Sequence, residues 1–160
     1  MTPFEIRTLN KSDQPWVESV LTKFWHSAKI VTRGKIHLAD QLPGFIAHQG
    51  EKRLGLITYH VHNNECEIVT LNSLAEQMGI GSALIAAVKH AAISSQCKRL
   101  WLITTNDNTP ALRFYQKRGF SLTAIYPNAL EQSRRLKPEI PLFGIDGIPL
   151  RDELELEMLL

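Results

Sequence analysis

The chain has 160 residues, enough to bury a substantial core, and we expect one domain over residues 1–160. Hydrophobic residues make up 44% and charged residues 21%, the balance of a soluble globular protein, which excludes a disordered or fibrous chain. The net charge of +2 argues against a nucleic-acid partner, and short basic runs such as Lys117-Arg118 are interpreted as solvated surfaces. Without an apolar run of about 20 residues or a signal-like N-terminus, we expect a cytoplasmic protein with no membrane partner.

The two cysteines, Cys66 and Cys97, fall in a predicted strand and a predicted loop. Neither is surrounded by residues at metal-ligand spacing. We therefore expect two reduced thiols and no bound metal, which agrees with the expected location in the cytoplasm.

The first third of the chain predicts a strand, a helix and a poorly patterned segment. Residues 4–9 alternate between apolar and polar side chains, as a half-buried strand does. Ser12 is a suitable N-cap, Pro15 is tolerated in the first helical turn, and the apolar spacing continues to about His26. Residues 27–44 have weak periodicity and several turn formers, and predict a loop or a short helix.

Three strands joined by short turns are expected next. Residues 45–48 and 54–61 have strand character and flank a turn at Gly50. Asn63-Asn64 favours left-handed backbone angles, which suits a tight turn into the β-branched run at residues 65–71. Because the turns are short, the three strands should be antiparallel neighbours.

Two glycines one residue apart, Gly79 and Gly81, lie where this third strand gives way to a helix. Apolar residues at Ile80, Leu84 and Val88 recur at helical spacing, and the helix should continue to about residue 95. The first N–H groups of a helix have no intrahelical partner, and glycine lets an anion approach them closely. The stretch therefore predicts a phosphate site.

A second unit of strand and helix follows. Residues 100–105 form a nearly continuous apolar run, typical of a strand buried on both faces. Because a strand and a helix precede it, this strand should lie parallel to strand 65–71 through a right-handed crossover. Thr109 is a suitable cap for a helix with Pro110 at its first position, and Gly119 is suited to end it.

The C-terminal part predicts a strand at residues 120–126, a short helix at 128–136 and a closing strand from Asp152. In the closing strand apolar residues alternate with glutamates, and this period of two outweighs the helix propensity of Leu and Glu. We interpret the glutamates as a solvated face rather than as an attractor for a cationic substrate. These glutamates are Glu153, Glu155 and Glu157. The elements together predict an α/β domain with a mixed sheet.

Three motifs occur in a fixed order in the middle of the chain: Gly79-Ile80-Gly81, the segment NTPALRFY from Asn108 to Tyr115, and Gly119-Phe120. They resemble the Q/R-x-x-G-x-G/A loop, the N-x-x-A-x-x-F-Y segment and the G-F pair of the GCN5-related N-acetyltransferase (GNAT) family. The resemblance spans about residues 51–126. It implies a GNAT-like fold, with a mixed, mostly antiparallel sheet, a parallel βαβ core and flanking helices, and acetyl-CoA as cosubstrate.

The chain departs from the family pattern at Glu76, where the family usually has Gln or Arg three residues before the first glycine. A carboxylate repels a pyrophosphate, so we expect Glu76 to point away or to contact hydroxyl or amide groups of the cofactor. The other contacts are expected mainly from backbone groups. The cofactor-binding residues that the resemblance implies are Val69, Leu71, Glu76, Gln77, Met78, Gly79, Ile80, Gly81, Ser82, Asn106, Asn108 and Tyr115.

Two of these assignments have plain alternatives. A Gly-x-Gly loop also occurs in nicotinamide dinucleotide sites, but that fingerprint requires a third glycine, where this chain has Leu84. Asn106 and Asn108 are suited to hydrogen bonds with the pantetheine arm, and equally to turn and cap chemistry.

In the family, an amine attacks the thioester of acetyl-CoA directly. The resemblance implies that Tyr115 protonates the departing thiolate and that the backbone N–H of Leu71 stabilises the oxyanion. The alternative for Tyr115 is a core tyrosine packed beside Phe114. The strand that contains Val69 should also pair with the pantetheine, as an added strand would.

The proton acceptor is open at this point. Glu65 and Glu67 are two residues apart and share one face of their strand, so either is a candidate base. The alternatives are a solvated strand edge for both glutamates, and an ordered water as the base. The histidines, including His37 and His60, have no spacing that singles one out.

The resulting hypothesis is an acetyl-CoA-dependent N-acetyltransferase that acts on a primary amine of a small molecule or a protein. The alternatives are a non-catalytic acyl-CoA-binding module on the same fold and a phosphate-binding module for nucleotides. The irregular segments 27–44 and 128–147 should border the acceptor pocket, because specificity usually resides in loops. The sequence leaves the oligomeric state open between a monomer and a homodimer.

Overall fold

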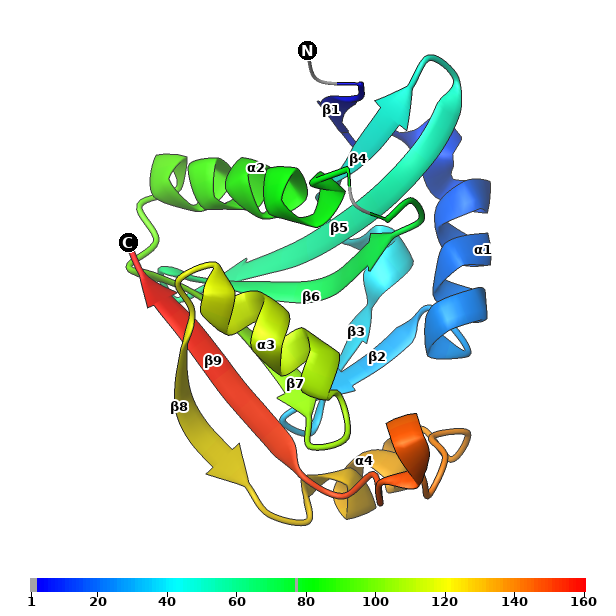
Figure 1. The fold of residues 1–160 in the computed structure, drawn as a ribbon, viewed down its shortest axis with the longest axis vertical. Coiled ribbons are helices and arrows are strands. Elements are labelled where there is room, and N and C mark those ends of the chain that lie inside the picture. Colours follow the sequence, from blue (N-terminus) through cyan, green and yellow to red (C-terminus); the bar gives the residue numbers. More distant parts are fainter. Residues whose placement is uncertain (1–2, 77) are drawn as a thin grey trace.

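The computed structural model describes residues 3–76 and 78–160 (Figure 1). A seven-stranded sheet has the strand order β1-β4-β5-β6-β7-β9-β8, and β2 and β3 form a separate two-stranded sheet. Within these residues, no helix is both long and apolar enough to cross a bilayer. The strands are β1 (Glu5–Thr8), β2 (Lys29–Thr32), β3 (Lys35–Leu38), β4 (Gly44–Gln49), β5 (Lys52–His62), β6 (Glu65–Ser73), β7 (Arg99–Thr105), β8 (Ser121–Tyr126) and β9 (Glu153–Leu159). The α-helices are α1 (Gln14–Trp25), α2 (Ile80–Ser94), α3 (Thr109–Lys117) and α4 (Ala129–Leu136), and 3-10 turns occur at Lys11–Asp13, Ala39–Gln41 and Ile145–Gly147.

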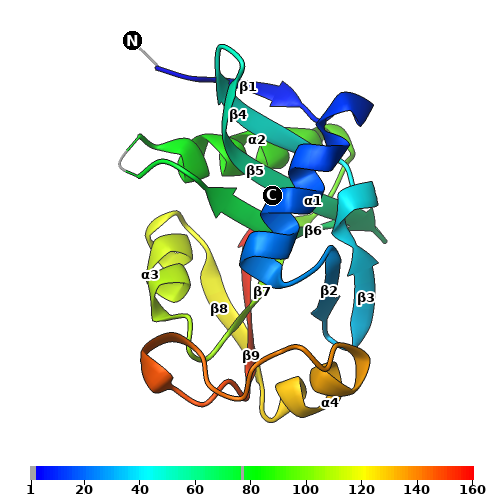
Figure 2. The same cartoon turned by 90° about the vertical axis from the view of Figure 1, so that its right-hand side faces the viewer.

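The sheet lies between two hydrophobic cores, one on each face. On one face, α2 buries Leu84 and Val88, both fully inaccessible to solvent, against the sheet. On the other face, α1 buries Val17 and Leu21 together with residues of β2 and β4. Figure 2 shows α1 and the β2–β3 hairpin together on the face opposite to α2. The helical spacing predicted for both helices is confirmed.

The two central strands, β6 and β7, are paired over only part of their length. β6 and β7 are parallel, as predicted, but they pair only from Glu65 to Ile68. On its other side β6 pairs with β5, and the register shifts so that Val69 has no partner, which is the pattern of a β-bulge. Beyond this point the sheet spreads into a V, with β6 in one arm and β7 in the other (Figure 1). We call this opening the wedge.

The segment at residues 27–44 differs from its prediction. It forms the hairpin β2–β3, in which Thr32 pairs with Lys35 across a two-residue turn. Both turn residues, Arg33 and Gly34, have positive φ (51° and 72°), as a type I′ turn requires. Arginine is uncommon at such an angle, so the sequence lacks the Asn-Gly signal that marks this turn.

Two helix caps also differ from their predictions. Ser12 is not the cap of the first helix; its backbone N–H donates to Asn10, which caps a 3-10 turn ahead of α1. Likewise, Asn108 rather than Thr109 caps α3, because its side-chain oxygen accepts from the N–H of Ala111 at 3.2 Å. The helices themselves begin within a few residues of the predicted positions.

The predicted solvated face of the closing strand is wrong. In β9, Glu153 and Glu155 are 2% and 8% exposed. Glu155 accepts hydrogen bonds from Arg99 at 2.9 Å and from the Tyr126 hydroxyl at 2.8 Å. β9 lies between β7 and β8, so its polar face is covered by side chains of both neighbours and, at Glu153, by the backbone of the β2–β3 turn.

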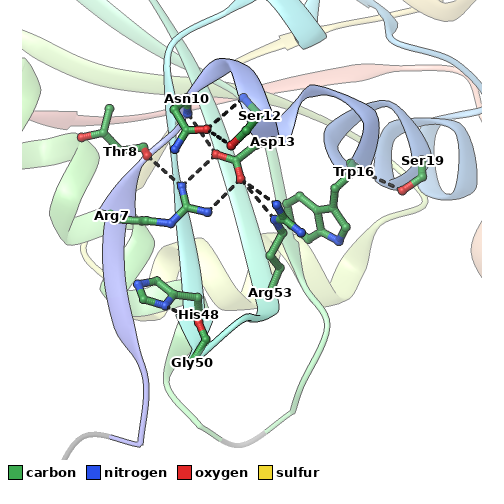
Figure 3. Close-up of polar contacts among 10 residues, drawn as sticks. All are labelled: Arg7, Thr8, Asn10, Ser12, Asp13, Trp16, Ser19, His48, Gly50 and Arg53. Carbon is green, nitrogen blue, oxygen red and sulfur yellow. Dashed lines mark hydrogen bonds and ion pairs between the residues drawn. The ribbon is translucent and has the colours of Figure 1, made fainter.

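The N-terminal strand is held to the sheet by a buried carboxylate, Asp13, which is 0% exposed (Figure 3). Arg7 of β1 donates to both oxygens of Asp13 at 2.8 Å, and Arg53 of β5 donates at 3.1 Å. The backbone N–H of Asn10 adds a fourth donor at 2.9 Å. The hydrogen bonds from Arg7 are the main reason why the pKa of Asp13 lies well below its ordinary value.

The first prediction concerns stability. Asp13→Asn should lower the free energy of unfolding at pH 7 by about 3 kcal/mol, because two guanidinium groups lose their shared anion. A depressed carboxyl pKa stabilises the fold above the unfolded-state pKa of about 4, and this contribution is lost as the pH falls below that value. The deficit of the variant should therefore shrink between pH 5 and pH 3. Urea unfolding at both pH values measures it, with the exposed Asp146→Asn as control; a deficit independent of pH would contradict the assignment.

Candidate active site

Three hollows that share lining residues lie around the wedge. The first, which we call the α2 groove, is about 560 Å³ and lies between the starts of α2 and α3. The second, the wedge cavity, is about 400 Å³ and shares Leu71 and Tyr115 with the groove. The third, the far pocket, is about 570 Å³ and shares Trp25 and Val69 with the wedge cavity. Through these shared residues the three hollows follow one another from the face of α2 to the face of α1, and we call this series the passage.

The α2 groove begins at a glycine loop. Gly79 has φ +76° and is the N-cap of α2, a backbone angle that side chains other than Asn or Asp rarely adopt. Gly81 is required for another reason, because a Cβ there would lie 2.8 Å from the Phe114 ring of α3. The close contact between the two helices leaves the first-turn N–H groups of α2 beside the groove, where an anion can reach them.

Arg118 places a positive charge at this helix start. Its guanidinium lies 3.6 Å from the centre of the Phe114 ring and donates to the Ser82 hydroxyl at 2.7 Å. A second hydrogen bond, to the Phe114 carbonyl at 2.9 Å, fixes the side chain further. Arg118 and the exposed Glu76 both line the groove. Lys117 and Arg118 are exposed, as expected of a solvated run, but the sequence interpretation gave Arg118 no role at the groove.

Tyr115 lies where the groove meets the wedge cavity. Its ring packs edge-on between Phe114 and Phe120, with centroid distances of 5.2 and 5.4 Å. The residue is 8% exposed, and this burial raises the pKa of its hydroxyl, so the group holds its proton at neutral pH. The packing agrees with the core role, and the position on the passage agrees with a proton donor. The two roles are compatible in one residue.

A buried polar cluster lies beside the far pocket. Glu67 of β6 is 4% exposed and accepts a hydrogen bond from the Thr32 hydroxyl at 2.8 Å. The Nε2 atom of His37 lies 3.2 Å from the Thr32 hydroxyl and 3.3 Å from the Glu67 carboxylate. Thr32 lines the far pocket and also a smaller cavity of about 250 Å³ that includes His60. A solvated strand edge is therefore wrong for Glu67.

The walls of the far pocket are mainly apolar. Phe24 and Trp25 come from the end of α1, Ile103 from β7, and Ile140 from the loop after α4. Lys137 also lines the pocket, and its ammonium donates to the carbonyls of Trp25 and Lys29 at 2.5 Å. Burial lowers the pKa of this lysine. These two hydrogen bonds hold the loop to the end of α1 and close that side of the pocket.

Residues 6–120 match the model of the Acetyltransferase (GNAT) family. The chain belongs to this family. A relative from Bacillus subtilis, the uncharacterized protein YdhI, is 44% identical over 133 residues, which are 82% of this chain and 83% of the relative.

Solved structures of acetyltransferases have the same fold. The IAA acetyltransferase from Bacillus cereus superposes with a TM-score of 0.75 at 22% identity, over 98% of this chain and 99% of the other. A GNAT family acetyltransferase from Elizabethkingia anophelis with acetyl-CoA bound gives 0.71 at 19% identity, over the full length of both chains. The predicted family and fold class are thus confirmed.

The GNAT motif residues lie mostly along the passage. The α2 groove is lined by Leu71, Glu76, Gly79, Ile80, Gly81, Ser82 and Tyr115, and the wedge cavity by Val69 and Asn108. Met78 is partly buried and packs against the core on the α2 side. Gln77 lies outside the described residues.

Two predicted site residues lie away from the passage. The Asn106 amide donates to the Pro149 carbonyl at 2.8 Å and accepts from the N–H groups of Arg151 and Asp152, so it holds the chain ahead of β9. Glu65 pairs with Arg99, at the end of β6 that remains joined to β7. Among the described residues that line the α2 groove, the wedge cavity and the far pocket, neither Asn106 nor Glu65 occurs.

Proposed function

We propose that this chain is an acetyl-CoA-dependent N-acetyltransferase that transfers the acetyl group to the primary amine of a small molecule. The observation that carries the proposal is the passage through the sheet, with an anion cradle at one end, a separate pocket at the other, and Tyr115 between them. A non-catalytic acyl-CoA-binding module requires the anion site in the α2 groove. It does not require a second pocket on the other side of Tyr115. The far pocket has mainly apolar walls and a volume of about 570 Å³, in the size range of small-molecule sites, which favours a small amine over a protein terminus.

The α2 groove suits the cofactor. Its phosphates would be held by backbone N–H groups between Gly79 and Ser82, at the positive end of the α2 dipole. Arg118 supplies the cation that the family usually has at the position of Glu76. Glu76 is exposed, so its carboxylate can turn to solvent. The pantetheine arm would run along the edge of β6 that β7 leaves unpaired, toward Val69 and Leu71.

The reaction then follows from the residues at the wedge. The free amine attacks the carbonyl carbon of the thioester, and the N–H of Leu71 donates to the oxygen as negative charge develops on it. The C–S bond breaks when the intermediate collapses, and the thiolate takes the proton of the Tyr115 hydroxyl.

Glu67 is the proton acceptor in this proposal, and it acts through Thr32. The amine reaches the far pocket largely protonated and must lose one proton before it attacks. Thr32 lines that pocket, and its hydroxyl already donates to Glu67 at 2.8 Å. Thr32 takes this proton while the amine is still in the far pocket, before its nitrogen reaches the wedge, and the proton of the Thr32 hydroxyl passes to the Glu67 carboxylate, beside which His37 lies.

The second prediction concerns the cofactor. Arg118→Gln should weaken the binding of CoA about tenfold, because one charge-assisted contact of about 1.4 kcal/mol is lost. Isothermal titration with CoA measures the affinity. The matched control is Arg135→Gln on α4, whose side chain is 77% exposed and which lines none of the three hollows among the described residues. An unchanged affinity in Arg118→Gln would remove this residue from the site.

The third prediction concerns the acid. Tyr115→Phe should lower kcat about 100-fold, since general acid catalysis typically contributes 10²–10⁴, and should leave the affinity for CoA within about threefold. Release of free thiol from acetyl-CoA measures turnover, and Tyr59→Phe on β5, at a partly buried tyrosine, controls for the loss of a tyrosine hydroxyl. If the unmodified protein binds CoA but no amine provokes thiol release, the non-catalytic alternative gains.

The fourth prediction concerns the proton path. Thr32→Val preserves the shape of the side chain but removes the hydroxyl, and should lower kcat/KM about 30-fold, within the range of general base catalysis. Thr32→Ser should restore most of the rate, and Glu67→Gln should match the valine variant. Thermal unfolding of each variant reports on folding. Equal kcat/KM in Thr32→Val and the unmodified protein would mean that the proton leaves by another route.

A further inference from the structure

One charged group that lines the far pocket, Glu153, has unused hydrogen-bonding capacity. Among the other charged groups, Lys137 donates to two carbonyls, and Asp107 accepts from the Thr105 hydroxyl at 2.5 Å and from the N–H of Ile145 at 3.0 Å. The Glu153 carboxylate receives a single donor, the N–H of Arg33, shared between its oxygens at 3.2 and 3.3 Å. A carboxylate can accept about four hydrogen bonds, so most of the acceptor capacity of Glu153 is unused.

Glu153 is also unpaired in charge. It is 2% exposed, and within the described residues no lysine, arginine or histidine forms an ion pair with it. The Arg33 guanidinium attracts the carboxylate without forming an ion pair with it, because it is stacked 3.2 Å from the centre of the Tyr126 ring. A buried carboxylate without a counter-ion is costly to ionise, and burial raises its pKa. An incoming cation would remove most of this cost.

The position of Glu153 separates it from the reacting nitrogen. It pairs with Thr105, the last residue of β7, whereas β6 and β7 separate after Leu102. Three residues along a strand span about 10 Å. Glu153 lines the far pocket, but the described walls of the wedge cavity do not include it. It can therefore contact the distal end of an acceptor whose amine lies at the wedge.

We propose that the acceptor is a small dicationic amine, in which a hydrocarbon spacer joins the reacting primary amine to a second cationic group that pairs with Glu153. The inference rests on the function proposed above and names the substrate class of that site. Apolar side chains between the two ends, Ile103 and Trp25 among them, suit the spacer. In this complex the Glu153 carboxylate would accept a hydrogen bond from the Arg33 N–H and also pair with the bound cation.

Three amines of equal chain length test the proposal: hexamethylenediamine, n-hexylamine and ε-aminocaproate, which carry a distal cation, methyl group and anion. Thiol release from acetyl-CoA gives kcat/KM for each. After correction for its two equivalent amines, the diamine should have a kcat/KM at least tenfold higher than that of n-hexylamine. The kcat/KM of ε-aminocaproate should be the lowest of the three. In Glu153→Gln, which keeps the size of the side chain and its acceptor for Arg33, the preference for the diamine should fall to within about twofold.

The matched control is Glu157→Gln. Glu157 lies on the same face of β9 but pairs with Arg99 and lines none of the hollows among the described residues, so the preference should persist in this variant. Unchanged CoA affinity in Glu153→Gln reports an intact cofactor site. Turnover of all three amines at similar rates in the unmodified protein would overturn the role of Glu153 and leave the acetyltransferase standing. Absence of turnover with all three, while CoA binds, would count against both.

Discussion

The loss of pairing between β6 and β7 after Ile68 is the constraint on which the rest of the site depends. The bulge at Val69 turns β6 away from its parallel neighbour while both strands stay bound to their outer partners. The sheet therefore opens in its middle without losing its cores. The opening joins two faces that a continuous sheet would keep apart, and it leaves a row of backbone groups free to bind an extended ligand.

The two ends of the passage differ in charge. At the α2 groove, a helix N-terminus and Arg118 offer positive charge, so an anionic ligand is favoured. On the other face, Glu67 and Glu153 are buried carboxylates; His37 lies 3.3 Å from the first, and the second accepts only from the backbone N–H of Arg33. Thr32, the Arg33 backbone and His37, all in the β2–β3 hairpin, are the groups that contact these two carboxylates. The hairpin thus organises the acceptor side, as the glycine loop organises the cofactor side.

Prediction from sequence was most successful where the signal is local. The helical face of α2, the glycines at its start and the parallel strand after it each follow from spacing within about 15 residues. Prediction failed where distant segments decide the environment. Glu153 alternates with leucine in a pattern typical of a solvated strand face, yet Arg33, 120 residues away, covers it. Arg118 is exposed, as expected, but its contact with Ser82 could not be predicted, because Ser82 lies on another helix, 36 residues earlier.

By itself, the sequence determined the family and the order of elements, since glycine at Gly79 and Gly81 and the Asn108–Tyr115 segment combine local backbone requirements with a recognisable motif. The tertiary structure alone decided which of two neighbouring glutamates is buried. Glu65 and Glu67 have the same period and the same face, but Arg99 binds the first near solvent, and Thr32 and His37 enclose the second. Burial depends on what packs against a strand, and strand period carries no information about that partner.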